Sequence, residues 1–492
     1  MTDRDYNHSR PLDVHRSSNY SEVNPFIDEI YNNHIKDVSE NANIQKKHLK
    51  LVLLDLFIAW IDDPELNIGV HMHEGAYSDG TVFNKGKSRY NELNIKVSTI
   101  KVVHRLRDLG FIGFKKGYEG SVEYAPRLSR IWGKDKLIKL FKDAAFSYFD
   151  INYSKDREVV ILRNEDKVDL EYEDNETTEA MRELLHKYNE LLRTTFIDIP
   201  ELDIPRIELK EKKQRRRRNK PIFVNISHHD KFTRRIFNNS TFEEGGRFYG
   251  GWWQRVDESH RSRIRLNNKA IVEIDYSALH VILAYAKVNV DYWKLTDKDP
   301  YRVPIDGINN PEHIRDINKL FFLLSLNASN EISLYKAFRS ELDYKEYPYK
   351  FPDKVLAKLL EDIKLLHPKI AHLVCSGAGL KLMNLDSQMV EFIIKDFVKT
   401  NTPILTVHDS FVVPFGQEDR LHKLMKKAFM SVSKQEIVRI KYNANITERA
   451  LYVSQHQDRG YFLDAVSFIK KGNPSNGYEF RMKRHNKWMS RK

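Results

Sequence analysis

Two aspartates in this 492-residue chain stand where a pair of carboxylates could do chemistry. Asp275 ends the apolar segment 271–275, and Asp409 follows the apolar segment 404–407 by two residues. A carboxylate at the end of a buried strand is costly to keep unless a positive partner, such as a bound cation, offsets its charge. Taken alone, Asp275 is better explained as the cap of the helix that follows it. The case for a metal site therefore depends on Asp409 lying beside Asp275.

Neighbouring strands would let the two aspartates share a pair of divalent ions. Two Mg²⁺ ions roughly 3.5–4 Å apart clamp the attacking and leaving oxygens of an in-line phosphoryl displacement. Hard carboxylate oxygens suit Mg²⁺, with Mn²⁺ as the alternative ion, and a nucleoside triphosphate supplies the remaining oxygens. The predicted metal ligands are Asp275 and Asp409.

A pair of cations lies between the two aspartates in the chain. Asn310-Pro311 predicts the start of a helix, because proline is favoured at the first helical position. Arg315 and Lys319 are four residues apart, so they share one face of that helix. Two fixed cations one turn apart suit the β- and γ-phosphates of an incoming nucleotide. Such a pair is usually just a solvated helix surface, and its position between the two acids is what favours the functional interpretation.

These residues require a sheet with helices packed around it. Segments 404–407 and 411–414 predict a β-hairpin whose tight turn carries His408 and Asp409. Segment 437–442 predicts a further strand that could complete the sheet. The expected fold class is therefore α+β.

In the N-terminal region, a short helix over 88–93, a longer helix over 98–109 and two strands over 111–118 and 122–132 are expected to follow one another. This order predicts a winged helix-turn-helix and is similar to the winged-helix domains of plasmid replication initiators and regulators. The second helix would enter the major groove, and the turn between the strands would touch phosphate. The expected DNA contacts are Lys101, Arg105, Lys115 and Lys116. The alternative is a small helical domain with a basic solvated surface.

The composition favours an acidic partner. The formal net charge is +12, which points to nucleic acid first and an anionic membrane second. The sequence has no run of eighteen apolar residues, and its N-terminus is polar, so we expect neither a membrane span nor a secretory signal. A single cysteine, Cys375, excludes an internal disulfide and a cysteine-rich zinc site. We expect a cytoplasmic, nucleoid-associated protein.

Several motifs together resemble family A DNA polymerases and the related single-subunit RNA polymerases. Asp275-Tyr276-Ser277, Arg315-x-x-x-Lys319 and His408-Asp409 occur in the order of motifs A, B and C of those families. Residues 245–250 are similar to the Gly-Arg element that precedes motif A in both groups. Residues 384–388 resemble the Asn-to-Gln helix of family A polymerases, so the resemblance covers about half of the chain.

The resemblance implies a role for each matching residue. Asp275 and Asp409 would bind the two metal ions, while Arg315 and Lys319 would hold the triphosphate. Lys319 is also the implied proton donor to pyrophosphate. Tyr276 would contact the nucleotide through its carbonyl and by packing. His408 and Gln388 would position the primer end, and Arg247 would contact the nucleic-acid backbone. The reaction would be attack of a 3′-hydroxyl on an α-phosphate, driven by positioning and metal electrostatics.

Two positions of the implied nucleotide site depart from the family pattern. His280 stands where family A DNA polymerases have a glutamate that helps to exclude ribonucleotides. Asn327 stands where both groups tend to have a tyrosine that helps to select the sugar. The choice between dNTPs and NTPs therefore stays open, and a primase-like polymerase is a further reading.

We predict a template-directed nucleotidyltransferase built from five segments. These are a disordered N-terminus (1–23), a winged-helix domain (24–145), a thumb-like helical connector with a basic linker (146–240), a polymerase palm with an antiparallel sheet and helical fingers (241–470) and a basic tail (471–492). The enzyme would extend DNA primers during replication of a mobile element, with an accessory replication protein as a further partner. The competing hypothesis is a catalytically inactive DNA-binding initiator or regulator that keeps a polymerase-like fold.

Overall fold

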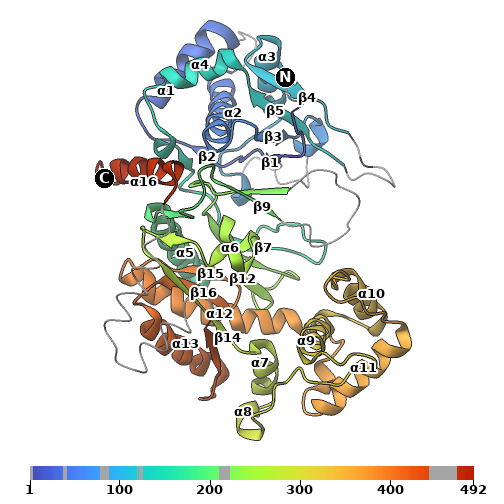
Figure 1. Cartoon of the computed structure of the whole chain (residues 1–492). Helices are drawn as coiled ribbons and strands as arrows, with labels where there is room; N and C mark the ends of the chain where they lie inside the picture. Colours follow the sequence, from blue (N-terminus) through green and yellow to red (C-terminus); the bar gives the residue numbers. More distant parts are fainter. Residues whose placement is uncertain are drawn as a thin grey trace.

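The computed structural model describes residues 4–36, 41–77, 88–118, 120, 126–209, 222–442 and 474–492. The chain is a mixed α+β protein. Figure 1 shows the N-terminal part at one end of the molecule, the connecting segments in the middle and a group of helices at the other end. Within the described ranges, no helix combines the length and the apolar character needed to cross a membrane.

The N-terminal part is a four-stranded sheet packed against a buried helix. That helix, α2 (Ala42–Asp62), begins where the Asn41 side chain accepts hydrogen bonds from the backbone N–H groups of Asn43 and Ile44. The other elements are β1 (Ser9–Pro11), α1 (Val23–Ile30), β3 (Asn67–Val70), the 3₁₀ turn η3 (Arg89–Asn91), α3 (Ser98–Asp108), β4 (Ile112–Lys115), β5 (Ser129–Gly133) and α4 (Asp135–Asp143). The strand order in the sheet is β1–β3–β5–β4.

The helix–turn–helix–hairpin order expected for this region is present. The short helix is the single 3₁₀ turn η3, and α3 ends before Gly110, which adopts the left-handed φ of 73° that favours glycine. Strands β4 and β5 pair antiparallel and are shorter than expected. Part of the connection between them, residues 119 and 121–125, lies outside the described residues.

The first 23 residues, expected to be disordered, have defined positions from residue 4 onward, so that prediction was wrong. Strand β1 pairs parallel with β3, and β2 (Arg16–Ser17) pairs with β6 (Asn152–Tyr153). Arg10 and Arg16 bind the two oxygens of Asp55, which is buried in α2, at 2.7 and 3.1 Å. A buried carboxylate needs such partners. The polar composition hid the pairing, because the acid lies about 40 residues further along the chain.

The connecting region contains one long helix and several short strands. Helix α5 (Glu176–Thr194) buries one face, which includes Leu185, Tyr188 and Leu192. The strands are β7 (Val160–Leu162), β8 (Ile197–Asp198), β9 (Arg206–Leu209), β10 (Ile222–Asn225), β11 (Thr233–Phe237), β12 (Gly245–Gly250) and β13 (Arg265–Leu266). They pair as β12–β11–β7, β10–β9 and β13–β8. The basic run 212–220 lies outside the described residues.

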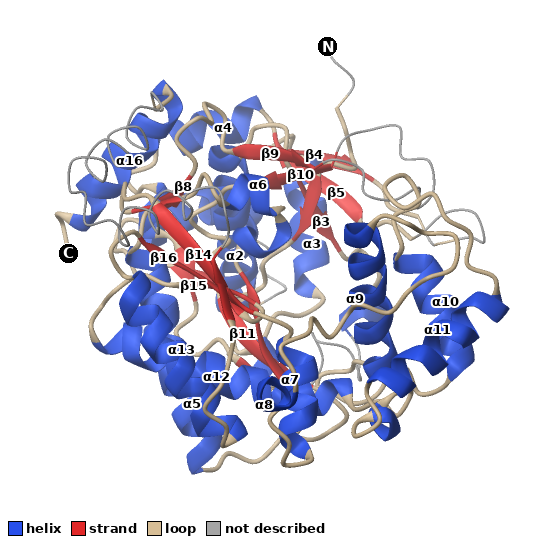
Figure 2. Cartoon of the chain, turned by 60° about the horizontal axis from the view of Figure 1, so that its bottom comes forward, coloured by secondary structure: helices blue, strands red, loops and turns tan. Residues whose placement is uncertain are grey.

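A second four-stranded sheet, wholly antiparallel, carries both candidate aspartates. Its strands are β14 (Ile271–Tyr276), β15 (Leu405–Val407), β16 (Ser410–Pro414) and β17 (Ile440–Tyr442), in the order β15–β16–β14–β17. The hairpin and the added strand are therefore as predicted. Figure 2 shows this sheet with α7 (Leu279–Lys287), α12 (Gly379–Lys399) and α13 (Glu418–Ser433) near it.

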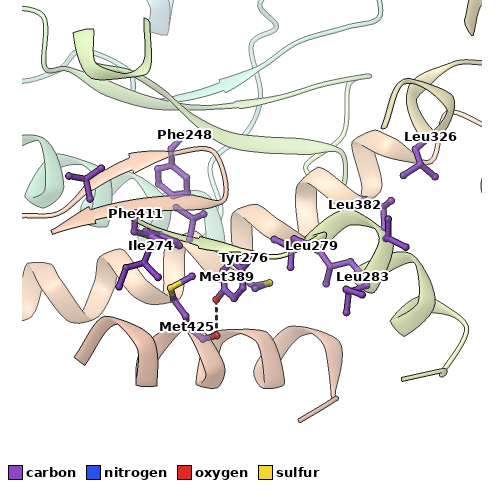
Figure 3. Packing of buried hydrophobic residues seen from close by; sticks show 14 of the residues in the cluster. Phe248, Ile274, Tyr276, Leu279, Leu283, Leu326, Leu382, Met389, Phe411 and Met425 are labelled. Atoms are coloured by element: carbon purple, nitrogen blue, oxygen red, sulfur yellow. Dashed lines mark hydrogen bonds between the residues drawn. The ribbon is translucent and has the colours of Figure 1, made fainter. Parts of the chain in front are cut away.

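Apolar side chains fix this sheet against its helices. Ile274 and Phe411 from the sheet pack with Met389 of α12 and Met425 of α13 in one buried cluster (Figure 3). The Tyr276 hydroxyl donates to the Met425 carbonyl at 2.7 Å. The sheet edge that bears the aspartates is thus held by a close-packed core.

Three helices form the group at the far end of the molecule: α9 (Pro311–Asn327), α10 (Glu331–Glu341) and α11 (Asp353–Leu366). Helix α9 begins at Pro311 as predicted, and the Asn310 side chain accepts hydrogen bonds from two backbone N–H groups of its first turn. Phe321 of α9 packs edge-on against Phe338 of α10, with ring centroids 5.2 Å apart.

The basic C-terminal tail forms a docked helix, α16 (Asn476–Met489). Trp488 is buried and stacks on Phe149, with ring centroids 5.3 Å apart and planes at 17°. Arg481 binds Asp198 through two hydrogen bonds. Trp488 is therefore not available to stack on a nucleic-acid base, because its ring is used inside the protein. The sequence alone does not reveal this distant partner.

Candidate functional site

The structure brings Asp275 and Asp409 together at one edge of the second sheet. Asp275 pairs with Ser410 across β14 and β16, so Asp409 precedes the residue directly opposite Asp275. The turn that carries Asp409 is tight, and His408 adopts a left-handed φ of 58° there. The pairing expected from the two apolar segments is present.

The carboxyl group of Asp275 is incompletely hydrogen-bonded. Its Oδ1 is buried and has no hydrogen-bond partner among the described residues. Burial and the charge of Asp409 raise the pKa of Asp275 to about 8, against the opposing charge of Lys319. Buried polar atoms are nearly always satisfied, so an exception calls for a missing partner.

A divalent cation fits this pair of acids. The available donors are hard carboxylate oxygens, which are the ligands that Mg²⁺ prefers. In the described part of the chain there is no group of three or more histidine, cysteine, aspartate or glutamate side chains that could enclose an ion. Asp275 and Asp409 would therefore supply only part of the coordination, which is the usual arrangement for Mg²⁺ with a bound phosphate.

A third acid beside the pair is neutralised. Glu273 lies two residues before Asp275, so the two side chains leave the same face of β14. Arg261 donates to both Glu273 oxygens at 3.0 and 3.1 Å, and the Ser410 hydroxyl donates to one of them at 2.8 Å. Glu273 is thus a structural acid. The alternation of acids along the strand could have revealed it from sequence, but Arg261 could not be assigned.

Arg247 and His280 meet at a buried acid, Asp386. The Arg247 Nε donates to Asp386 at 3.0 Å, and the His280 Nε2 lies 2.8 Å from both Arg247 Nη2 and Asp386 Oδ2. Burial acts to raise the pKa of Asp386, but the hydrogen bond with His280 and the charge of Arg247 outweigh it and lower that pKa. The side chain of Asp386 is fully buried.

This triad changes the interpretation of three positions. Arg247, expected to contact nucleic acid, is largely buried against Asp386. His280, expected beside the nucleotide sugar, is 8% exposed and occupied by the same acid. Asp386 was missed, because it lies 139 residues from Arg247 and 106 from His280.

The two cations of α9 differ in their surroundings. The Arg315 Nε donates to Asp299 at 2.7 Å, and its guanidinium lies 5.6 Å from the ring centre of Tyr301. Lys319 is exposed, and its charge acts on Asp275. Burial and the charge of Asp409 raise the pKa of Tyr301, which places its phenol in the same electrostatic environment. Asp299 and Tyr301 precede the helix in a loop and were not singled out from sequence.

The remaining residues with predicted contacts lie on α12, at the tip of the β15–β16 hairpin, at the end of α9 and on β14. Gln388 is exposed on α12, and its amide donates to Asn384 at 2.8 Å. His408 is exposed at the hairpin tip, with its ring centre 6.2 Å from that of Tyr249. Asn327 is at the end of α9 and donates to the Leu323 carbonyl at 2.7 Å. The phenol of Tyr276 points into the core toward α13, which leaves its backbone as the available part (Figure 3).

The four predicted DNA-contacting residues of the N-terminal part are exposed. They are Lys101 and Arg105 on α3, Lys115 at the end of β4 and Lys116 just after it. The side chain of Arg105 donates to the His34 carbonyl at 3.2 Å. These residues belong to the opposite end of the molecule from α9 (Figure 1).

The chain shows little similarity to known proteins in sequence or in structure. No protein-family model and no curated protein match the chain. Among solved structures, the POL domain of Pol1 from M. smegmatis, in complex with DNA primer-template and dNTP, is 14% identical over 43% of this chain and 47% of that chain. The TM-score is 0.25, so function has to rest on the geometry of the site itself.

Proposed function

We propose that this protein is a template-directed nucleotidyltransferase that extends a 3′-hydroxyl with nucleoside triphosphates. The observation that carries the proposal is the pairing of Asp275 with Asp409 at one sheet edge, with a buried, unpartnered oxygen on Asp275 and the charge of Lys319 acting on it. Two acids with an unsatisfied oxygen suit a divalent ion, and a cation on the facing helix suits its phosphate ligand.

Each residue of the proposed site would have a separate role. Asp275 and Asp409 would hold Mg²⁺, or Mn²⁺ as the alternative, and bound metal ions stabilise the charge on attacking and leaving oxygens. Lys319 would bind the triphosphate and donate a proton to the departing pyrophosphate. Arg315, which is oriented by its hydrogen bond to Asp299, would bind the same phosphates one helical turn before Lys319.

The triad of Arg247, His280 and Asp386 would form the buried base of the site. Hydrogen bonds of about 3 Å connect the three side chains, of which Asp386 is fully buried and Arg247 and His280 are largely buried. A buried, fully connected polar network is rigid. It would position the primer end near Gln388 and His408, which are exposed around it.

The N-terminal part would bind duplex DNA. Its support is the order of η3, α3, β4 and β5 together with the exposed cations on α3 and at the end of β4. The roles of a mobile element and of an accessory protein stay predictions.

The alternative is a DNA-binding initiator or regulator without catalysis. The observation in its favour is that His280 is locked to Asp386 and takes the place of a residue that contacts the nucleotide in the polymerases it resembles. The unsatisfied oxygen of Asp275 opposes this reading, because a protein without metal chemistry gains nothing from keeping it buried.

Primer extension separates the two readings. Wild type should extend an annealed template–primer with Mg²⁺ or Mn²⁺ and either dNTPs or NTPs. Asp275→Asn and Asp409→Asn should each lose about a hundredfold or more of that activity. Asp419→Asn, an exposed acid on α13, is the matched control and should retain it. A wild-type protein that binds duplex DNA but incorporates nothing on any template would show that the inert alternative is correct.

A further inference from the structure

A cavity of about 220 Å³ lies between the N-terminal part, the connector and the C-terminal helix. Its walls come from the end of α2, the turn around Phe149, strand β8, the loop before β11 and helix α16. None of its lining residues belongs to the aspartate site described above. Five segments far apart in the sequence thus enclose one space, which is typical of a ligand site between domains.

Three basic side chains lining the cavity have unused hydrogen-bonding groups. His485 is 3% exposed, and neither of its ring nitrogens has a hydrogen-bond partner in the described ranges. Among the described residues Arg484 has no hydrogen bond or ion pair, and its guanidinium only faces the rings of Tyr148 and Phe480. Lys231 is buried and donates to the Thr195 carbonyl at 2.6 Å and lies 3.2 Å from a His228 nitrogen, which leaves a third donor.

Each acid of the cavity already accepts a hydrogen bond from another part of the protein. Asp198 accepts two hydrogen bonds from Arg481, at 2.7 and 3.0 Å. Asp62 accepts from the Tyr148 hydroxyl, and Asp203 accepts from the backbone N–H of Gly477. Among the described residues, Arg484 and Lys231 make no direct contact with an acid, and the charges of Asp62 and Asp198 act on them only from further away. Burial lowers the pKa of Lys231 to about 7, so a bound anion would bring that pKa back up.

The rest of the wall is aromatic. Phe149, Phe196 and Phe480 line the same space. An apolar cavity of about 150 Å³ binds benzene, so the present volume holds one aromatic ring with one further substituent.

We propose that this cavity binds a small aromatic anion, a single ring bearing a carboxylate or a phosphate, with the ring against the phenylalanines and the anionic group on Arg484, Lys231 and His485. The shared chemistry is an anion on a flat apolar body. The affinity of Arg for planar carboxylate and phosphate groups favours this class over a cation or a neutral ring.

The test is calorimetric titration of the full-length protein with benzoate, phenyl phosphate, benzyl alcohol and inorganic phosphate. At least one of the two aromatic anions should bind with one-to-one stoichiometry at millimolar concentration or below. Benzyl alcohol and inorganic phosphate should each bind at least about tenfold more weakly, since each lacks one half of the ligand. A preference for benzoate or for phenyl phosphate then identifies the anionic group.

Variants connect the binding to this cavity. Arg484→Gln should weaken the aromatic anion roughly tenfold to a hundredfold, the effect of losing one charge-assisted hydrogen bond. Lys483→Gln, an exposed neighbour on the same helix, is the control and should bind as wild type does. No saturable binding of either aromatic anion, equal binding of benzyl alcohol or inorganic phosphate, or equal behaviour of the two variants would each overturn the proposal. Arg484 is only half-buried, so the variant is expected to fold, and its thermal unfolding curve verifies this.

Discussion

At the scale of single residues, the proposed chemistry rests on Asp275 and the charges around it. A partly buried carboxyl group whose pKa is raised to about 8 is mostly protonated at neutral pH and must lose that proton before it binds a metal ion. Metal affinity should therefore fall as the pH falls below about 8, and binding should release a proton. The raised pKa reflects the cost of burying this acid beside Asp409 without a cation.

The positions of both aspartates at strand ends and of both cations on α9 could be predicted from sequence, because each follows a local pattern. The polar pairings around them could not. Arg261 and Asp386 reach their partners across 12 to 139 residues, and only the fold determines such distances. The assignment of His280 to a nucleotide contact illustrates this, since its actual partner is buried.

The buried triad predicts the effect of a glutamate at position 280. His280→Glu would place a second carboxylate beside Asp386 with only Arg247 to offset both. We expect the free energy of unfolding to fall on the order of 3–5 kcal/mol, as for an uncompensated buried charge. Adding Asp386→Asn should recover most of that loss, because one acid then again faces one arginine.

Urea denaturation of the single and double variants measures both effects. His372→Glu, at an exposed position, is the control and should change stability by less than about 0.5 kcal/mol. A His280→Glu protein as stable as wild type would show that the three side chains do not form a closed network.

Elements were predictable where their signals are local. The Asn310-Pro311 cap placed the start of α9, and the apolar runs on either side of His408 and Asp409 placed the β15–β16 hairpin. The order of the N-terminus and the helix at the C-terminus were not predicted, for the opposite reason. Their order comes from contacts with distant residues, such as Arg16 with Asp55 and Trp488 with Phe149.

The docking of α16 makes a prediction at the scale of the element. Trp488→Ala should lower the free energy of unfolding by about 3–5 kcal/mol, because a buried aromatic side chain is lost from the core. Phe480→Ala on the same helix should cost less than about 1 kcal/mol, since that ring is 61% exposed. Thermal unfolding measures both. Unchanged stability of Trp488→Ala together with weaker binding of single-stranded DNA would contradict the docked position of the ring.

The whole molecule separates two surfaces that are expected to meet nucleic acid. Arg105 and Lys116 are exposed on the N-terminal part, whereas the aspartates lie in the other half of the molecule (Figure 1). The net charge of +12 favours nucleic-acid binding without assigning it to either half. The two activities should therefore be separable by mutation.

Arg105→Gln and Lys116→Gln should each weaken duplex binding and reduce the dependence of log affinity on log salt by about one, as expected for one lost phosphate contact. Extension of a preannealed primer should stay within about twofold of wild type. Lys354→Gln, an exposed lysine on α11, is the control for a change of net charge. Fluorescence anisotropy across a salt series gives the slopes. Slopes equal to that of the control would refute the assignment of this surface.

Titration of Mn²⁺ into the protein, followed by electron paramagnetic resonance at several pH values, tests the central claim most directly. Wild type and Asp419→Asn should bind alike, with affinity falling roughly tenfold per pH unit below about pH 8. Asp275→Asn and Asp409→Asn should bind at least about tenfold more weakly, and Asp275→Asn should lose that pH dependence. If both variants bind Mn²⁺ as wild type does, Asp275 and Asp409 are not the metal site and the proposed mechanism is wrong.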